Sequence, residues 1–164
     1  MRNALVVITC AAALTAARPG TSAAQTGRDP MRFGVQVNFG SDSKFGIGGR
    51  IRHSLQGLFP AAPLSGIASA DVYFPGRGFT ELALNYNVVY NFRPASAPKV
   101  TPYAGAGLNF SHITGNGLSD SQLGLNILGG MEFRSAGSSV TPFLELKVIL
   151  DRGDQLVVTG GIKF

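Results

Sequence analysis

The sequence predicts an all-β fold, an eight-stranded antiparallel up-and-down transmembrane β-barrel. Apolar and polar residues alternate with a period of two through most of the chain, the pattern of strands that have one apolar and one polar face. Charged residues make up only 14% of the 164 residues, whereas a soluble domain usually carries about 25%. No run of apolar residues after residue 24 is long enough for a transmembrane helix. A closed barrel is the other structure that satisfies all of its backbone hydrogen bonds in lipid.

The first 24 residues are expected to be a cleaved signal peptide. A basic start at Arg2 precedes an apolar run over 4–17, and Ser22-Ala23-Ala24 supplies the small residues that a signal peptidase reads. Fourteen helical residues span about 21 Å, too little for a hydrocarbon core of roughly 30 Å, so a membrane anchor is disfavoured. The expected parts of the chain are the signal peptide 1–24, a short lead over 25–30 that starts at Gln25, and the barrel domain over 31–164.

The expected mature chain has no thiol and a small charge surplus. Its only cysteine, Cys10, lies in the signal peptide, so a disulfide or a thiolate metal site is excluded. Without Arg2 and Arg18, 12 basic and 9 acidic side chains remain, which makes the net charge +3. The basic residues are scattered and form no Lys/Arg cluster, which argues against nucleic-acid binding.

Eight alternating segments of roughly 8 to 14 residues are expected as strands, long enough to cross a bilayer when tilted. The fourth is the clearest, because Leu82, Leu84 and Tyr86 alternate there with Asn85 and Asn87. Residues typical of turns separate the segments, and the one long connection runs from Ser54 to Gly66. The segments lie near 32–39, 45–52, 68–74, 81–92, 100–112, 122–134, 143–149 and 155–164.

The apolar face is expected to meet lipid. This face carries no acidic or basic residue in any segment. Contact with lipid would require this, because a Lys or Arg side chain on the lipid face at the bilayer midplane costs about 2–4 kcal/mol of stability. Its aromatic residues gather near the two ends of the strands, as the girdles of outer-membrane barrels do. A soluble lipocalin-like barrel is the alternative, but it requires a more highly charged exterior. The expected girdle residues are Phe33, Phe39, Phe45, Phe74, Tyr90, Phe92, Phe110 and Phe133.

The polar face then lies inside the barrel. Buried charges must be paired or hydrogen-bonded, so an internal salt-bridge network is expected, with Asn and Gln in the gaps. Eight strands enclose a space that side chains fill, so an open pore is not expected. The residues expected in this interior network are Arg32, Arg50, Arg52, Asp71, Glu81, Glu132, Arg134, Glu145, Lys147 and Lys163.

Two stretches have a characteristic pattern, Thr101–Leu108 and Leu125–Phe133, the second followed by Thr141–Leu146. They resemble strands of the small outer-membrane β-barrel superfamily that includes the OmpA transmembrane domain, OmpX and the opacity-type proteins. The terminal Ile162 and Phe164 resemble the C-terminal signal that the barrel-assembly machinery reads, although Thr159 replaces an expected glycine.

The resemblance spans about residues 31–164. It implies a monomer in the outer membrane of a Gram-negative-type envelope, with both termini in the periplasm. The implied partners are membrane lipid and, during insertion, the assembly machinery. The connections placed on the outside are short, and the long one falls on the periplasmic side, which argues against an adhesin.

Little of the sequence suggests catalysis. The run around His112 resembles the His-x-Ser-Asn element of lipid A deacylases, but Thr114 stands in place of the serine and Gly115 in place of the asparagine. The tripeptide Arg152-Gly153-Asp154 is interpreted as a tight turn. No metal-ligand cluster or phosphate-binding loop is present, so no catalytic residue, cofactor, metal or nucleic-acid partner is expected. The predicted function is a non-enzymatic barrel with a structural or surface role; the alternatives are a lipid A-modifying hydrolase, a narrow channel and a soluble ligand-binding barrel.

Overall fold

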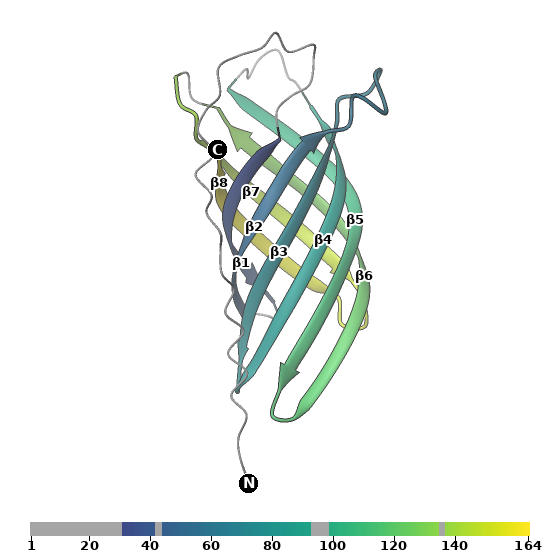
Figure 1. The fold of residues 1–164 in the computed structure, drawn as a ribbon, viewed down its shortest axis with the longest axis vertical. Coiled ribbons are helices and arrows are strands. Elements are labelled where there is room, and N and C mark those ends of the chain that lie inside the picture. Colours follow the sequence, from purple (N-terminus) through teal and green to yellow (C-terminus); the bar gives the residue numbers. More distant parts are fainter. Residues whose placement is uncertain (1–30, 42–43, 93–98, 135–136) are drawn as a thin grey trace.

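A computed structural model describes residues 31–41, 44–92, 99–134 and 137–164, which form a closed antiparallel barrel (Figure 1). Each strand pairs with its neighbour in the sequence, and β1 pairs with β8 to close the sheet. The predicted fold class is therefore confirmed. The strands are β1 (Arg32–Gly40), β2 (Lys44–Ser54), β3 (Leu64–Gly76), β4 (Phe79–Asn91), β5 (Val100–Gly115), β6 (Leu118–Phe133), β7 (Thr141–Leu150) and β8 (Gln155–Lys163).

Some sequence-based expectations fall outside the described part of the chain. The signal peptide with Cys10 and the lead over 25–30 belong to this group, as do parts of the turns at 42–43, 94–98 and 135–136. Among the residues that the structure does describe, no helix is long and apolar enough to cross a membrane.

Two hairpins are tighter than the sequence suggested. The fifth and sixth segments were expected near 100–112 and 122–134, but only Asn116 and Gly117 join β5 to β6, with φ angles of 52° and 78°. Arg77 and Gly78 join β3 to β4 in the same way, with φ angles of 53° and 79°. Positive φ at both central residues is the geometry of the two-residue hairpin turn, and its twist matches that of the strands. As a result β5 and β6 each run for 16 residues, beyond the expected lengths.

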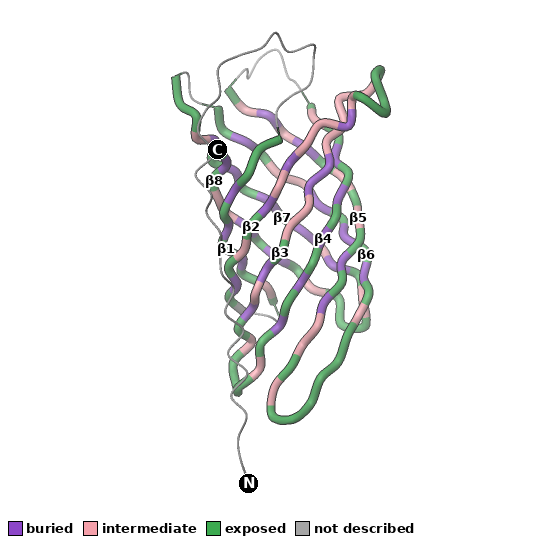
Figure 2. The backbone as a smooth tube through the Cα atoms, in the orientation of Figure 1, coloured by how far each residue is buried: buried purple, intermediate pink, exposed green. Residues whose placement is uncertain are grey.

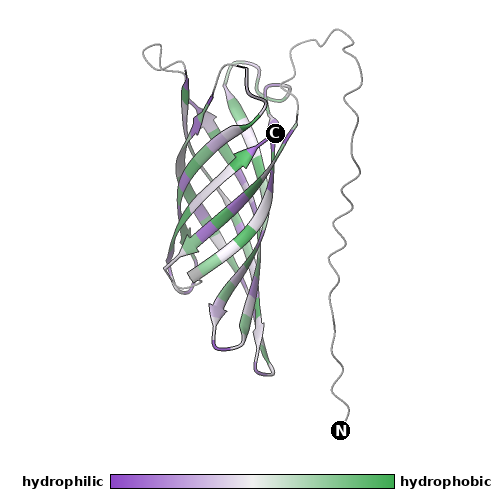
Figure 3. Ribbon diagram, turned by 90° about the vertical axis from the view of Figure 1, so that its left-hand side faces the viewer, coloured by the Kyte–Doolittle hydropathy of each residue, from purple (hydrophilic) through white to green (hydrophobic). Residues whose placement is uncertain are grey.

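The alternation of the sequence becomes an alternation of burial (Figure 2). In β4 every second residue from Glu81 to Val89 is buried, while those between, such as Leu84 and Tyr86, are exposed. Hydropathy alternates along the strands in the same manner (Figure 3). In the described strands the outward positions hold no Asp, Glu, Lys or Arg. The outer surface is therefore a continuous apolar band, the opposite of the soluble lipocalin-like alternative.

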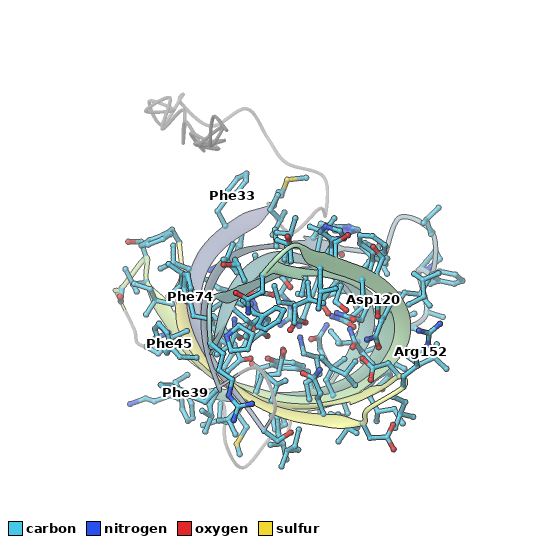
Figure 4. All side chains as sticks on the ribbon, turned by 90° about the horizontal axis from the view of Figure 1, so that it is seen from below. Phe33, Phe39, Phe45, Phe74, Asp120 and Arg152 are labelled. Atoms are coloured by element: carbon cyan, nitrogen blue, oxygen red, sulfur yellow. The ribbon has the colours of Figure 1, made fainter. Side chains whose placement is uncertain are left out.

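The expected girdle aromatics all lie on this outer surface. Figure 4 shows Phe33, Phe39, Phe45 and Phe74 pointing away from the barrel. The rings of Phe39 and Phe45 pack against each other with centroids 5.5 Å apart. Phe110 lies further from its strand end than the sequence suggested, because β5 continues to Gly115.

Several interior positions have no room for a side chain. A Cβ atom on Gly105 would lie 2.0 Å from the carbonyl oxygen of Val88 and 2.7 Å from the Cα atom of Val89. Both atoms belong to the backbone of β4, which can move only by disturbing its pairing with β5. The glycine therefore allows the two strands and the Val89 side chain to pack closely.

We expect Gly105→Ala to lower the free energy of unfolding by about 3 kcal/mol or more, the upper range for an overpacked core. The matched control is Gly160→Ala, where the added Cβ meets no atom within 4 Å, so its stability should be close to that of the wild type. Urea titration in lipid vesicles, with the folded fraction measured by gel mobility of unboiled samples, checks both variants. Equal stability of the two variants would contradict the packing argument.

Candidate functional site: the barrel interior

The central layer of the interior is an ion pair between Arg50 on β2 and Glu145 on β7. The guanidinium donates two hydrogen bonds to the carboxylate, 3.1 and 3.2 Å long. Tyr103 on β5 donates a third, 2.8 Å long, and the Arg50 Nε atom donates to Gln36 at 2.5 Å. The guanidinium carbon also lies 4.0 Å from the centroid of the Phe143 ring. All five side chains are buried, so this layer links four strands through the lumen.

A second ionic layer lies toward the end of the barrel that holds the C-terminus. Arg52 on β2 and Lys163 on β8 both bond to the same oxygen of Glu132 on β6. Since β2 and β6 are four strands apart in a closed barrel of eight, the Arg52–Glu132 pair crosses the lumen between opposite walls. Arg52 also donates to Asn91, whose amide donates in turn to the Pro63 carbonyl at 2.8 Å. This layer therefore joins the barrel wall to the β2–β3 connection.

A third layer holds the carboxylate of Asp71 without an ion pair among the described residues. Asp71 is completely buried. Its carboxylate accepts hydrogen bonds from four neutral side chains, which stabilise the negative charge. The donors are Gln36 (2.6 Å), Asn38 (2.8 Å), Ser69 (2.9 Å) and Asn85 (3.2 Å).

Next to it lies a layer of amides around Lys147. The buried ammonium donates to the Asn85 side-chain oxygen at 3.4 Å, and the amides of Asn109 and Asn126 donate to that same oxygen. Within the described residues, the Asn126 Oδ1 atom of this layer is buried without a hydrogen-bond partner, and so is the Tyr73 hydroxyl of β3. This layer is therefore less saturated with hydrogen bonds than the ionic layers.

Arg32 and Arg134 lie outside the network that the sequence suggested. Both have the parity of inward-facing residues, yet both are exposed. Arg32 is the first residue of β1 and Arg134 follows the last residue of β6, so their long side chains reach solvent at the rim. The residues that the structure places in the interior are Arg50, Arg52, Asp71, Glu81, Glu132, Glu145, Lys147 and Lys163.

Sequence reasoning did not identify the neutral partners of these charges. Tyr103, Asn85 and Asn91 each bond to a charged side chain. Parity directs Tyr103 and Asn85 into the barrel, but which charged side chain each of them contacts depends on which strands face each other across the lumen.

The other end of the barrel holds a cavity of about 130 Å³. Glu81, Ser111, Gln122 and Asp151 contribute to its lining. It lies at the mouth of the barrel, and the side chains of Asp71 and Lys147 are buried further along the lumen. At the same end an exposed ion pair joins Arg152 in the β7–β8 turn to Asp120 on β6 at 3.9 Å (Figure 4).

The two histidines lie on the outer face. His112 on β5 stands opposite Ser121 on β6, and its Nδ1 atom lies 2.8 Å from the serine hydroxyl. The Nε2 atom of His53 lies 3.2 Å from the Tyr86 hydroxyl. Among the described residues, no group of three or more His, Cys, Asp or Glu side chains could hold a metal ion.

Neither the protein-family models nor the curated proteins give a match to this sequence. The structure is similar to the N-terminal β-barrel domain of Pseudomonas aeruginosa OprF, with a TM-score of 0.63 and 15% identity over 81% of this chain and 96% of that chain. It is also similar to Neisserial surface protein A (TM-score 0.55, 16% identity, 81% of this chain and 94% of that chain). A de novo designed transmembrane β-barrel gives a TM-score of 0.53 at 16% identity, over 86% of this chain and 97% of the design. The fold of this chain is therefore that of the small eight-stranded outer-membrane transmembrane β-barrels.

Proposed function

We propose that this chain is a non-enzymatic outer-membrane barrel with a structural role in the cell envelope, and that its own side chains close it to solutes. The observation that carries the proposal is the filled lumen. The Arg50–Glu145 and Arg52–Glu132 pairs span it, and the charged groups of both pairs are nine-tenths or more buried. A water-filled channel would leave such groups exposed to solvent.

The proposed setting follows from the outer surface and the strand count. The uncharged apolar band fits the hydrocarbon of a bilayer, so membrane lipid is the proposed partner of the outer face. An even number of strands brings both chain ends to one side, which we assign to the periplasm. Ile162 and Phe164 lie on the outer face at that end, where the assembly machinery would read them. A monomer suffices, because the closed sheet leaves no lateral edge unpaired in the membrane.

The closed lumen predicts that the wild-type protein does not conduct ions. The folded mature chain, added to a planar lipid bilayer, should give no current steps above the detergent background. Arg52→Ala with Glu132→Ala removes the pair that crosses the lumen and serves as the test of whether any current passes through the interior. Steps in the wild type whose size changes in this double variant would replace the proposal with a narrow channel.

A lipid A-modifying hydrolase is the second candidate, and the His112–Ser121 contact favours it. A histidine can activate a neighbouring hydroxyl for ester hydrolysis when an acid orients the ring. Among the described residues no carboxylate bonds to His112; the nearby Asp120 instead contacts Gln122 and Arg152. We therefore expect lipid A acylation to be the same with the wild type, His112→Ala or Ser121→Ala. Loss of an acyl chain in the wild type alone would favour the hydrolase.

A further inference from the structure

The connection between β2 and β3, residues 55–63, presents apolar side chains outside the barrel; we refer to it as the apolar loop. Leu58 is 74% exposed and Phe59 is 52% exposed, and Gly57, Pro60 and Ala61 beside them are exposed as well. Phe33, on the lipid-facing surface, is 56% exposed. Burial of each of these two side chains would contribute about 1.5–3 kcal/mol of stabilising free energy, which is lost if they stay in water.

Hydrogen bonds hold the apolar loop in this shape. The backbone amides of Leu58 and Phe59 both donate to the Leu55 carbonyl at 2.9 Å, and Leu55 itself is buried. At the base of the loop, the Leu55 amide donates to the Leu64 carbonyl at 3.0 Å. Asn91 on β4 binds the Pro63 carbonyl through both its backbone and its side-chain amide. The exposed leucine and phenylalanine are thus displayed on an ordered frame tied to the wall of the barrel.

The apolar loop also carries no charge. No Asp, Glu, Lys, Arg or His occurs from Ser54 to Ala70, and Gln56 is the only residue of the loop with a polar side chain. The turns at the opposite end of the barrel differ, because they contain Arg77, Arg152 and Asp154. Exposed apolar patches mark membrane or protein contacts, and a protein partner usually meets a polar rim. An uncharged loop favours lipid.

The position of the apolar loop also favours a contact with lipid. It leaves the barrel at the end that holds the C-terminus and projects sideways past the strand ends (Figure 1). A loop that projects sideways from the end of the barrel lies against the surface of the bilayer that surrounds the barrel. The loop joins the lipid-facing surface of β4, where Leu64 pairs with Tyr90 and the Tyr90 and Phe92 rings lie 5.0 Å apart.

We propose that the apolar loop is an interfacial membrane anchor, which inserts Leu58 and Phe59 into the leaflet at the end of the barrel that holds the C-terminus. Aromatic and aliphatic side chains bind at this depth through the apolar area that they bury. The loop extends the girdle of β4 sideways, so it fixes the depth and tilt of this side of the barrel. The inference concerns a lipid contact beyond the strands and holds whichever side of the membrane the termini occupy.

The chain contains no tryptophan, so Phe59→Trp introduces a single fluorescent reporter at the tip of the loop. The protein is reconstituted into phosphatidylcholine vesicles whose acyl chains carry bromine near the headgroup. We expect blue-shifted emission and quenching at least about twofold stronger than that of Arg152→Trp, which places the reporter in an exposed turn at the other end. Phe92→Trp gives the reference for a girdle position, and aqueous iodide should quench the variants in the reverse order.

Leu58→Trp is a second reporter at the same tip, in case one replacement disturbs the turn. The gel mobility of unboiled samples confirms for each variant that the barrel is folded in the vesicles. Bromolipid quenching of both loop reporters no stronger than that of Arg152→Trp, in folded protein, would overturn the proposal and leave the loop as a contact for a protein partner.

Discussion

Glu145→Ala is expected to lower the free energy of unfolding by about 3–5 kcal/mol, the cost of removing one partner of a buried ion pair. The variant leaves the Arg50 guanidinium enclosed in the lumen without its carboxylate partner, with Gln36 and the Phe143 ring among its remaining contacts. It also leaves the Tyr103 hydroxyl without its acceptor. An unpaired charge and an unsatisfied hydroxyl are thus created in one buried layer.

Two controls separate the loss of the pair from the loss of side-chain volume. Asp154→Ala removes a carboxylate from an exposed turn and should change the stability by no more than about 0.5 kcal/mol. Arg50→Met combined with Glu145→Leu removes both charges and fills their space, so it should recover most of the stability that Glu145→Ala loses. Urea titrations in vesicles complete this double-mutant comparison. If the double variant were less stable than Glu145→Ala, the charge argument would be wrong.

Leu146→Arg is expected to cost about 2–4 kcal/mol, because it places a cation on the lipid face near the middle of β7. Leu146 is half exposed on the outer surface, between Gly129 of β6 and Val158 of β8. In hydrocarbon the new guanidinium must reach the headgroups or draw water into the bilayer. In a soluble barrel the same substitution would be neutral.

The same substitution at the strand end provides the depth control. Leu150→Arg, at the last residue of β7, can reach the interface and should cost about 0–1 kcal/mol. Leu146→Ala measures the loss of the leucine side chain alone. Unfolding titrations of the three variants in vesicles should rank Leu146→Arg as the least stable. Equal stability of the two arginine variants would show that the middle of this face does not contact lipid.

The two faces of the barrel could be predicted because the side-chain direction in a strand depends only on parity. In β4 the alternation of Glu81, Asn85 and Asn87 with Leu82 and Leu84 therefore indicated which residues are buried. The same parity applies to Phe143 and Ile149 of β7, which alternate with the outward-facing leucines and are both buried inside the barrel.

Parity says nothing about how far a side chain lies from the end of its strand. For this reason Arg32 and Arg134 were expected inside and are exposed at the rim. The same limitation applies to Phe110, whose depth changed when β5 proved longer. Strand length depended on how far the hairpin pairing continues toward Asn116 and Gly117, and only the paired register shows this.

The sequence by itself determined the number of strands, the face that each side chain occupies and the charge-free character of the outer band, because these depend on local periodicity and composition. The tertiary structure decided which charges meet. Arg50 and Glu145 are 95 residues apart and Arg52 and Glu132 are 80 apart, and each pair forms only because the closed barrel brings distant strands to a common height across the lumen. It also decided that the apolar loop points sideways, since the hydrogen bonds from Asn91 that orient it come from another strand.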